Sequence, residues 1–156
     1  ETLRRRYRDG FDDTRVVDDD TFIFPVSDDF GGGWARYGFS DVLKLAITLE
    51  LERQGLDFKR AARIAVNAFI PDEQSSTVGD FWIGRQRLID SNGDAWDPYV
   101  GGSHAEVFQP RDPNGTLVSI AACNIAAIEA SLRVKLADIG FRIHGNELRR
   151  KGEANV

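Results

Sequence analysis

Arginines gather at the start of the chain in a pattern suited to binding phosphate. Arg4, Arg5, Arg6 and Arg8 lie close together beside Tyr7. On a helix, they place positive charge over most of two turns, and affinity for DNA rests largely on neutralised phosphates. We expect Arg4, Arg5 and Arg8 to contact the groove and phosphates of DNA. The alternative is an ordinary solvated helix face.

A second basic and aromatic pair, Arg36 and Tyr37, follows a glycine loop at residues 31–33. Residues 21–26 and 34–39 are predicted to form the two strands of a hairpin around that loop. In winged-helix proteins the tip of such a hairpin lies on the phosphate backbone or in the minor groove. We therefore expect Arg36 to reach the backbone and the Tyr37 hydroxyl to contact a phosphate.

Two helices separated by a turn are predicted after the hairpin. Ser40 is a good N-cap, and Gly55 stands where a helix would end in the left-handed conformation. The first helix is therefore expected from about Asp41 to Gln54. Its apolar residues cover too much of the circumference for a surface helix, so we expect it to be largely buried.

The second helix is predicted to start after Asp57 and to stop before Pro71. Its apolar residues recur at helical spacing: Phe58, Ala61, Ala62, Ala65, Ala68 and Phe69. Basic residues occupy its other faces. Among them, we expect Lys59 and Arg63 to contact the DNA backbone.

The segment from Trp34 to Ala68 resembles the middle of the DNA-binding domain of the mercury-resistance-regulator (MerR) family. In that family an Arg-Tyr pair in the wing precedes an Asp-Val-x-x-Leu helix and a glycine turn into the next helix. The matching residues here are Arg36-Tyr37, Asp41-Val42-Leu43-Lys44-Leu45, Gln54-Gly55-Leu56 and Ala61-Ala62. Residues 1–11 are similar to the family's recognition helix.

The resemblance covers roughly residues 1–70 and implies a winged-helix DNA-binding module. In the family another helix precedes the recognition helix, so we expect this chain to lack that helix or to be a fragment. We place the module at residues 1–71, a polar linker at 72–80, a second subdomain at 81–145 and a flexible tail at 146–156. The second subdomain is expected to serve dimerisation or sensing.

The second subdomain is predicted to be a small antiparallel sheet followed by a helix. Strands are expected at residues 81–90, 95–100, 106–109 and 116–121, with a tight turn at Asn92-Gly93. The helix is expected from Asn124 to Ile139, ended by Gly140. The predicted fold is thus α+β: a winged-helix-like helical N-terminal module, then a small sheet and a C-terminal helix.

One stripe of the C-terminal helix is apolar over four turns: Ile125, Ile128, Leu132, Leu136 and Ile139. Such a seam can bury against the sheet or pair with a second copy of the chain. Family members usually dimerise through a C-terminal helix, so the resemblance implies a homodimer formed by this helix.

Catalytic chemistry has little support in the sequence. His104 and His144 have no carboxylate pair or cysteine at metal-ligand spacing, and Cys123 reads as a small core residue. No nucleophile elbow, paired-histidine helix or phosphate-binding loop is present. We therefore predict a protein that is not an enzyme and needs no cofactor.

Composition is that of an ordinary globular protein, with 42% hydrophobic and 29% charged residues and a net charge of -5. No apolar run is long enough to cross a bilayer, and the single cysteine agrees with a reducing compartment. We expect a cytoplasmic regulator that binds specific sequences of double-stranded DNA as a dimer. The alternative is a protein-interaction adaptor on the same helical scaffold.

Overall fold

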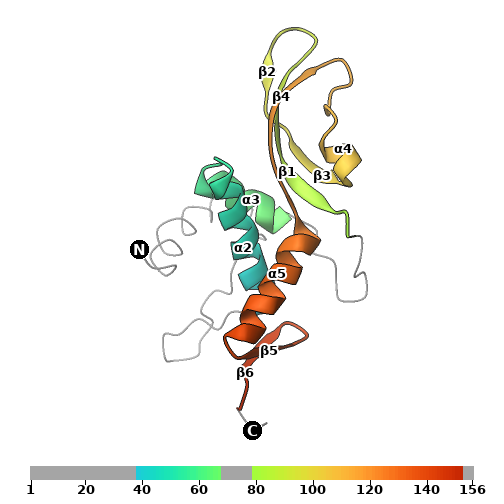
Figure 1. Ribbon diagram of the computed structural model, residues 1–156. Helices are drawn as coiled ribbons and strands as arrows, with labels where there is room; N and C mark the ends of the chain where they lie inside the picture. The colour runs from blue at the N-terminus through green and yellow to red at the C-terminus, as the bar shows by residue number, and fades with distance from the viewer. Residues whose placement is uncertain (1–37, 68–78, 153–156) are drawn as a thin grey trace.

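The structure, a computed structural model, describes residues 38–67 and 79–152 of the chain. It confirms the α+β prediction, because helices come first and a small antiparallel sheet and a C-terminal helix follow (Figure 1). The elements are α2 (Phe39–Arg53), α3 (Phe58–Asn67), β1 (Trp82–Ile89), β2 (Ala95–Trp96), β3 (Tyr99–Gly102), α4 (His104–Val107), β4 (Thr116–Asn124), α5 (Ile125–Asp138), β5 (Phe141–His144) and β6 (Glu147–Arg150).

Strand β1 is the centre of the sheet. Strand β4 pairs antiparallel along one edge of β1, while β2 and β3 pair in turn along the other edge. These strands and α4 project beyond the helices as one unit, which we call the sheet arm (Figure 1). The register between β1 and β4 shifts at Arg87 and Leu88, where a bulge leaves one residue of β4 unpaired.

Alternate residues of β1 serve the two faces of the arm. Ile83 points into the core shared with the helices, whereas Gln86 lies on the opposite face and is fully buried. The Gln86 amide nitrogen donates to the carbonyl oxygens of Val107 (2.7 Å) and Gln109 (2.5 Å), and its oxygen accepts from the Arg111 backbone N–H (3.0 Å). This side chain therefore holds α4 and the following loop against the sheet.

A continuous apolar core joins the helices to the base of the arm. Leu43, Ile47 and Leu51 of α2 are buried with residues of α3, β1, β4 and α5. In Figure 1, α2 and α5 lie side by side below the arm. The core thus unites two regions, residues 38–67 and 81–145, that were predicted to be separate units.

The apolar stripe of α5 packs within this core. Ile125 and Leu136 are buried there, and Ile128 and Leu132 pack against it. Ile139 is the exception and stays 69% exposed at the end of the helix. Of the two uses predicted for this seam, intramolecular burial is therefore the observed one. The predicted ends of the helix are confirmed, since the Asn124 side chain caps it and Gly140 takes a positive φ of 89°.

The beginning of α2 differs from the prediction. Gly38, rather than Ser40, is the N-cap, and Asn146 supplies partners for the first helical N–H groups. The Phe39 N–H donates to the Asn146 backbone oxygen, and the Ser40 N–H donates to its side-chain oxygen, both at 2.6 Å. A Cβ atom at Gly38 would lie 2.5 Å from the Asn146 side chain, so a larger residue there would displace the amide that caps α2.

Asn146 lies in the turn of the β5–β6 hairpin, where the sequence predicts only a flexible tail. That prediction is wrong for residues 147–150, which pair with β5 as strand β6. Leu148 packs against the core. This packing and the hydrogen bonds between the turn and α2 together fix the hairpin below α2 and α5.

Two of the predicted strands are also revised. Residues 106–109 begin inside helix α4, because Ser103 and Glu106 form a reciprocal capping box. Residues 95–100 divide into β2 and β3 around Pro98, which has no N–H to donate. The Asn92-Gly93 turn is confirmed, with Gly93 at a φ of 88°.

None of the helices in the described ranges is long and apolar enough to span a membrane.

Replacing Gln86 with leucine should lower the free energy of unfolding by about 2–4 kcal/mol, because two carbonyl oxygens and one N–H lose their partner in a buried setting. Urea unfolding measures this change. Arg87→Ala, at the exposed neighbouring position, is the control and should change stability by less than about 0.5 kcal/mol. Equal stabilities for the Gln86→Leu variant and the wild type would contradict the role given to this side chain.

Candidate nucleic-acid interface

The turn between α2 and α3 is built as the sequence predicts. Gly55 takes the left-handed conformation with a φ of 97°, and the Leu56 N–H donates to the Leu51 carbonyl oxygen at 3.2 Å. Asp57 then starts α3, because its side-chain oxygen accepts the Arg60 N–H at 3.1 Å. Both helix ends are therefore capped, and α3 has a fixed position on α2.

Helix α3 separates apolar and basic faces. Ala61, Ala62 and Ala65 are fully buried, and Ile64, which the predicted stripe omits, is buried beside them. Alanine on this face lets α3 approach α2 closely. The expected continuation of the stripe at Ala68 and Phe69 lies outside the described residues.

Lys59 and Arg63 lie four residues apart on α3 and share one side of the helix. Lys59 is exposed and Arg63 is partly exposed. Within the described ranges neither residue forms an ion pair, whereas their neighbour Arg60 pairs with Asp57 at 3.1 Å. Of the predicted DNA contacts, Lys59 and Arg63 are the two that lie within the described residues. Both are on the same side of α3.

The other predicted contacts are Arg4, Arg5, Arg8, Arg36 and Tyr37. All five lie outside the described residues, together with the proposed recognition helix and residues 21–37 of the proposed wing. Phe39, expected at the end of a wing strand, is instead the first residue of α2.

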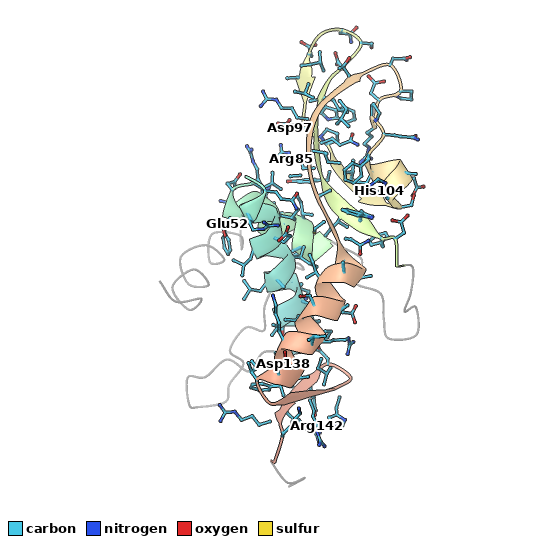
Figure 2. The ribbon with its side chains drawn as sticks, viewed as in Figure 1. Glu52, Arg85, Asp97, His104, Asp138 and Arg142 are labelled. Carbon is cyan, nitrogen blue, oxygen red and sulfur yellow. The ribbon has the colours of Figure 1, made fainter. Side chains whose placement is uncertain are left out.

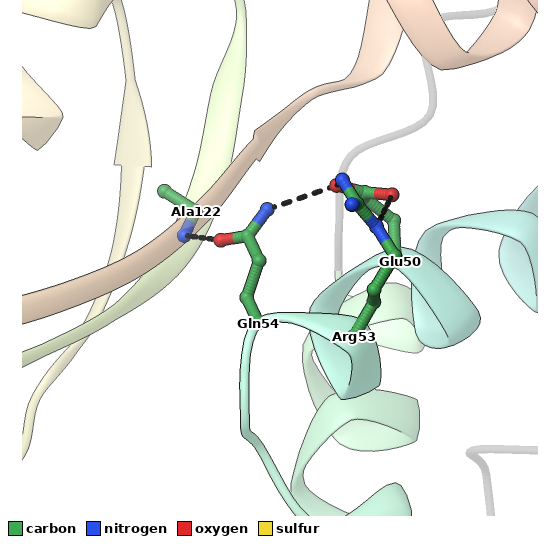
Figure 3. Close-up of polar contacts among 4 residues, drawn as sticks. All are labelled: Glu50, Arg53, Gln54 and Ala122. Atoms are coloured by element: carbon green, nitrogen blue, oxygen red, sulfur yellow. Dashed lines mark hydrogen bonds and ion pairs between the residues drawn. The ribbon is translucent and has the colours of Figure 1, made fainter.

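A polar cluster at the end of α2 ties the helices to the arm (Figure 3). The Glu50 carboxylate accepts hydrogen bonds from Arg53 at 2.8 and 3.0 Å and from the Gln54 amide at 3.1 Å. These bonds, with that from Arg53 the largest influence, lower the pKa of Glu50. The Gln54 oxygen in turn accepts the Ala122 N–H of β4 at 2.9 Å. Glu50 thus offsets the charge of Arg53. Gln54 satisfies one backbone N–H on the edge of β4 that faces away from β1.

Sequence reasoning missed this connection. The spacing of Glu50, Arg53 and Gln54 indicates contacts on one helix face. Nothing in the sequence links Gln54 to Ala122, because the two residues lie 68 positions apart and meet only in the folded chain.

A second surface that the sequence did not reveal lies on the arm. Arg85 of β1 donates to the Asp97 backbone oxygen at 3.2 Å and to its carboxylate at 3.4 Å. The same guanidinium group lies 5.6 Å from the centre of the Tyr99 ring. Figure 2 shows Arg85 and Asp97 on the side of the arm that adjoins the end of α2. The available signal was the spacing of Arg85 and Arg87, two positions apart on one predicted strand.

His104 belongs to an aromatic cluster on the opposite face of the arm. Its ring stacks on Phe108 with centroids 4.3 Å apart, and Trp82 meets both rings edge-on. Asp80 accepts hydrogen bonds from the Trp82 indole and from the His104 backbone N–H. Within the described ranges no three His, Cys, Asp or Glu residues form a group suited to a metal ion. These contacts assign His104 a packing role.

No protein-family model matches the chain, and neither a curated protein nor a solved structure is significantly similar to it.

Cys123 of β4 provides a pH test of the junction between the arm and the helices. Burial raises the pKa of its thiol from 9.0 to about 12, with a smaller contribution from the Glu50 carboxylate. The unfolded chain loses this proton at lower pH than the native chain. The free energy of unfolding should therefore fall as pH rises from 9 towards 12, by at most about 1.4 kcal/mol per pH unit.

Urea unfolding of the wild type and Cys123→Ala at pH 8 and pH 10.5 isolates this contribution, since other titrating groups are common to both proteins. The wild type should lose more stability between the two pH values. Identical losses would show that the thiol ionises equally well in the folded protein.

Proposed function

We propose that this protein is a sequence-specific DNA-binding transcriptional regulator that acts as a homodimer. The observation that carries the proposal is the basic side of α3. Lys59 and Arg63 are held together there, on a helix whose other side is fixed in the core. Phosphate contacts from such a helix position a protein on the duplex, and base contacts elsewhere supply sequence specificity.

The proposed base contacts belong to the segment that resembles the MerR recognition helix. Arg4, Arg5 and Arg8 serve the groove and its phosphates, and Arg36 and Tyr37 serve the wing. These assignments rest on residue type and on the resemblance. Lys59 and Arg63 then act as backbone anchors, so they contribute affinity that varies little with DNA sequence.

The dimer proposal is supported by the outward face of α5. Helical spacing places five small or apolar residues on this face, with Asp138 among them at its C-terminal end: Ala127, Ala130, Ser131, Val134 and Ala137. All five are exposed, and Val134 is 60% exposed. A helix with apolar residues on two opposite faces is typical of a buried helix. Because the core covers only the inward face, we assign the outward face to a second copy of the chain.

A twofold dimer predicts the form of the target. Each protomer presents the same contacts, so the DNA site should be a pseudo-palindrome with half-sites about one helical turn apart.

DNA binding is tested by fluorescence anisotropy of the full chain with a mixed pool of duplexes at low and moderate salt. Lys59→Ala combined with Arg63→Ala should weaken binding about tenfold and reduce the salt slope by about 2, since two phosphate contacts are lost. An Arg4, Arg5 and Arg36 triple-alanine variant should bind still more weakly.

The matched control is Lys135→Ala combined with Arg142→Ala, which removes the same two kinds of charge from exposed positions outside α3. It should bind like the wild type. If the two double variants weaken binding equally, net charge alone explains the effect. If the wild type does not bind any duplex, the proposal falls and the adaptor alternative takes its place.

The dimer is tested with Val134→Lys, which should convert the protein to a monomer in sedimentation velocity because a charge would be buried at the interface. Helicity should be unchanged, since Val134 is exposed in the monomer. Ile139→Lys is the control. Ile139, the C-cap of the same helix, is similarly exposed but lies about 140° around the helix axis from Val134. A wild type that sediments as a monomer would exclude this dimer at the concentration used.

A second candidate function, the protein-interaction adaptor, is favoured by the exposed side chains of the arm. Trp96, Tyr99, Phe108 and Val118 are large hydrophobic residues, each at least 36% exposed. Aromatic residues of this kind are enriched at protein interfaces. The salt dependence described above separates the two functions, because binding through apolar contacts changes little with salt.

A further inference from the structure

We infer that one face of the sheet arm, formed by Arg85, Arg87, Tyr99 and Ser119, is a second contact surface for the phosphate backbone of duplex DNA. This inference rests on the proposed DNA-binding function and extends it from α3 to the arm. We call these four residues the arm face.

Strand register places all four residues on the same side of the sheet. Arg85 and Arg87 follow Ile83 at alternate positions of β1, so they project from the face that Ile83 turns towards the helices. Tyr99 of β3 lies directly opposite Arg85, and Ser119 of β4 lies directly opposite Arg87. Residues paired in this way share a face.

The arm face adjoins the helices and the other side of the sheet is covered. Gln54, at the end of α2, bonds to Ala122, and the neighbouring Ala121 pairs with Arg85. The arm face therefore starts where α2 turns towards α3, and Arg87 lies about 13 Å along β1 from Ile83. On the opposite side, Gln86 holds α4 and its loop against the sheet.

The chemistry of the arm face is that of hydrogen-bond donors. Arginine, serine and tyrosine are side chains that commonly contact phosphate oxygens. The Asp97 carboxylate beside them is paired with Arg85, whose guanidinium group also lies over the Tyr99 ring. Arg87 is exposed and, within the described ranges, forms no ion pair, so its charge is available to a phosphate.

Acidic residues limit the contact to the root of the arm. Asp90 and Asp94 lie at the tip, beyond Arg87, and the Asp90 carboxylate accepts the N–H groups of Asn92 and Asp94. Negative charge at the tip disfavours phosphate there. The arm face and the basic side of α3 thus form two separate anchors, both next to the α2–α3 turn.

The test uses the full chain and the duplex pool described above. Arg87→Ala should weaken binding roughly fivefold and reduce the salt slope by about 1, because one phosphate contact is lost. Arg142→Ala is the matched control, since it removes the same charge from the exposed surface of β5, at the opposite end of the molecule from the arm (Figure 2). It should leave affinity and slope unchanged. Arg87→Lys should restore most of the affinity.

The outcomes separate this inference from the proposed function. If DNA binding depends on Lys59 and Arg63 but is unaffected by Arg87→Ala, the inference is wrong and the function of α3 stands. Equal losses in Arg87→Ala and Arg142→Ala would also overturn it. If the wild type binds no duplex, both proposals fail. Binding to an acidic protein, lost in Arg87→Ala without any DNA binding, would assign the arm face to that partner instead.

Discussion

The apolar junction between α2, α5 and the base of β1 and β4 is the constraint on which the rest of the structure depends. Leu43, Ile47 and Leu51 are almost completely removed from water there, together with Ile125 of α5. Such burial contributes about 2 kcal/mol for each large aliphatic side chain. Because the junction fixes α5 against α2, it sets the direction of the arm above and of the β5–β6 hairpin below.

Polar side chains at the margins of this junction fix how the sheet, the helices and the hairpin are positioned relative to one another. Gln54 caps an edge N–H of β4, Gln86 binds the loop after α4, and Asn146 satisfies the first N–H groups of α2. Each amide side chain forms hydrogen bonds with backbone groups, which would be costly to leave unpaired. The sheet, the helices and the hairpin are held together by these three residues as well as by apolar contacts.

The two proposed DNA contacts follow from this arrangement. Helix α3, directly after the α2–α3 turn, presents Lys59 and Arg63, and the adjoining root of the arm presents Arg85 and Arg87. Both anchors belong to elements fixed in one core, so their spacing is set before binding, and preorganised contacts lose less entropy on association. The outward face of α5 is separate from both, which leaves it available to a second copy of the chain.

The sequence by itself determined the local elements. Helical spacing and the glycines at positions 55 and 140 located the ends of the two main helices, and Asn92-Gly93 located a hairpin. These signals act over a few residues, so they can be read without the fold. They also placed Lys59 and Arg63 on the outer side of α3. Only the tertiary structure decided that Asn146 caps α2, that Gln54 reaches Ala122, and that the α5 stripe packs inward. It alone also placed Arg85 and Arg87 beside the α2–α3 turn. These contacts join residues distant in sequence, and the choice between burial within the chain and burial against a partner depends on which surfaces the whole fold covers.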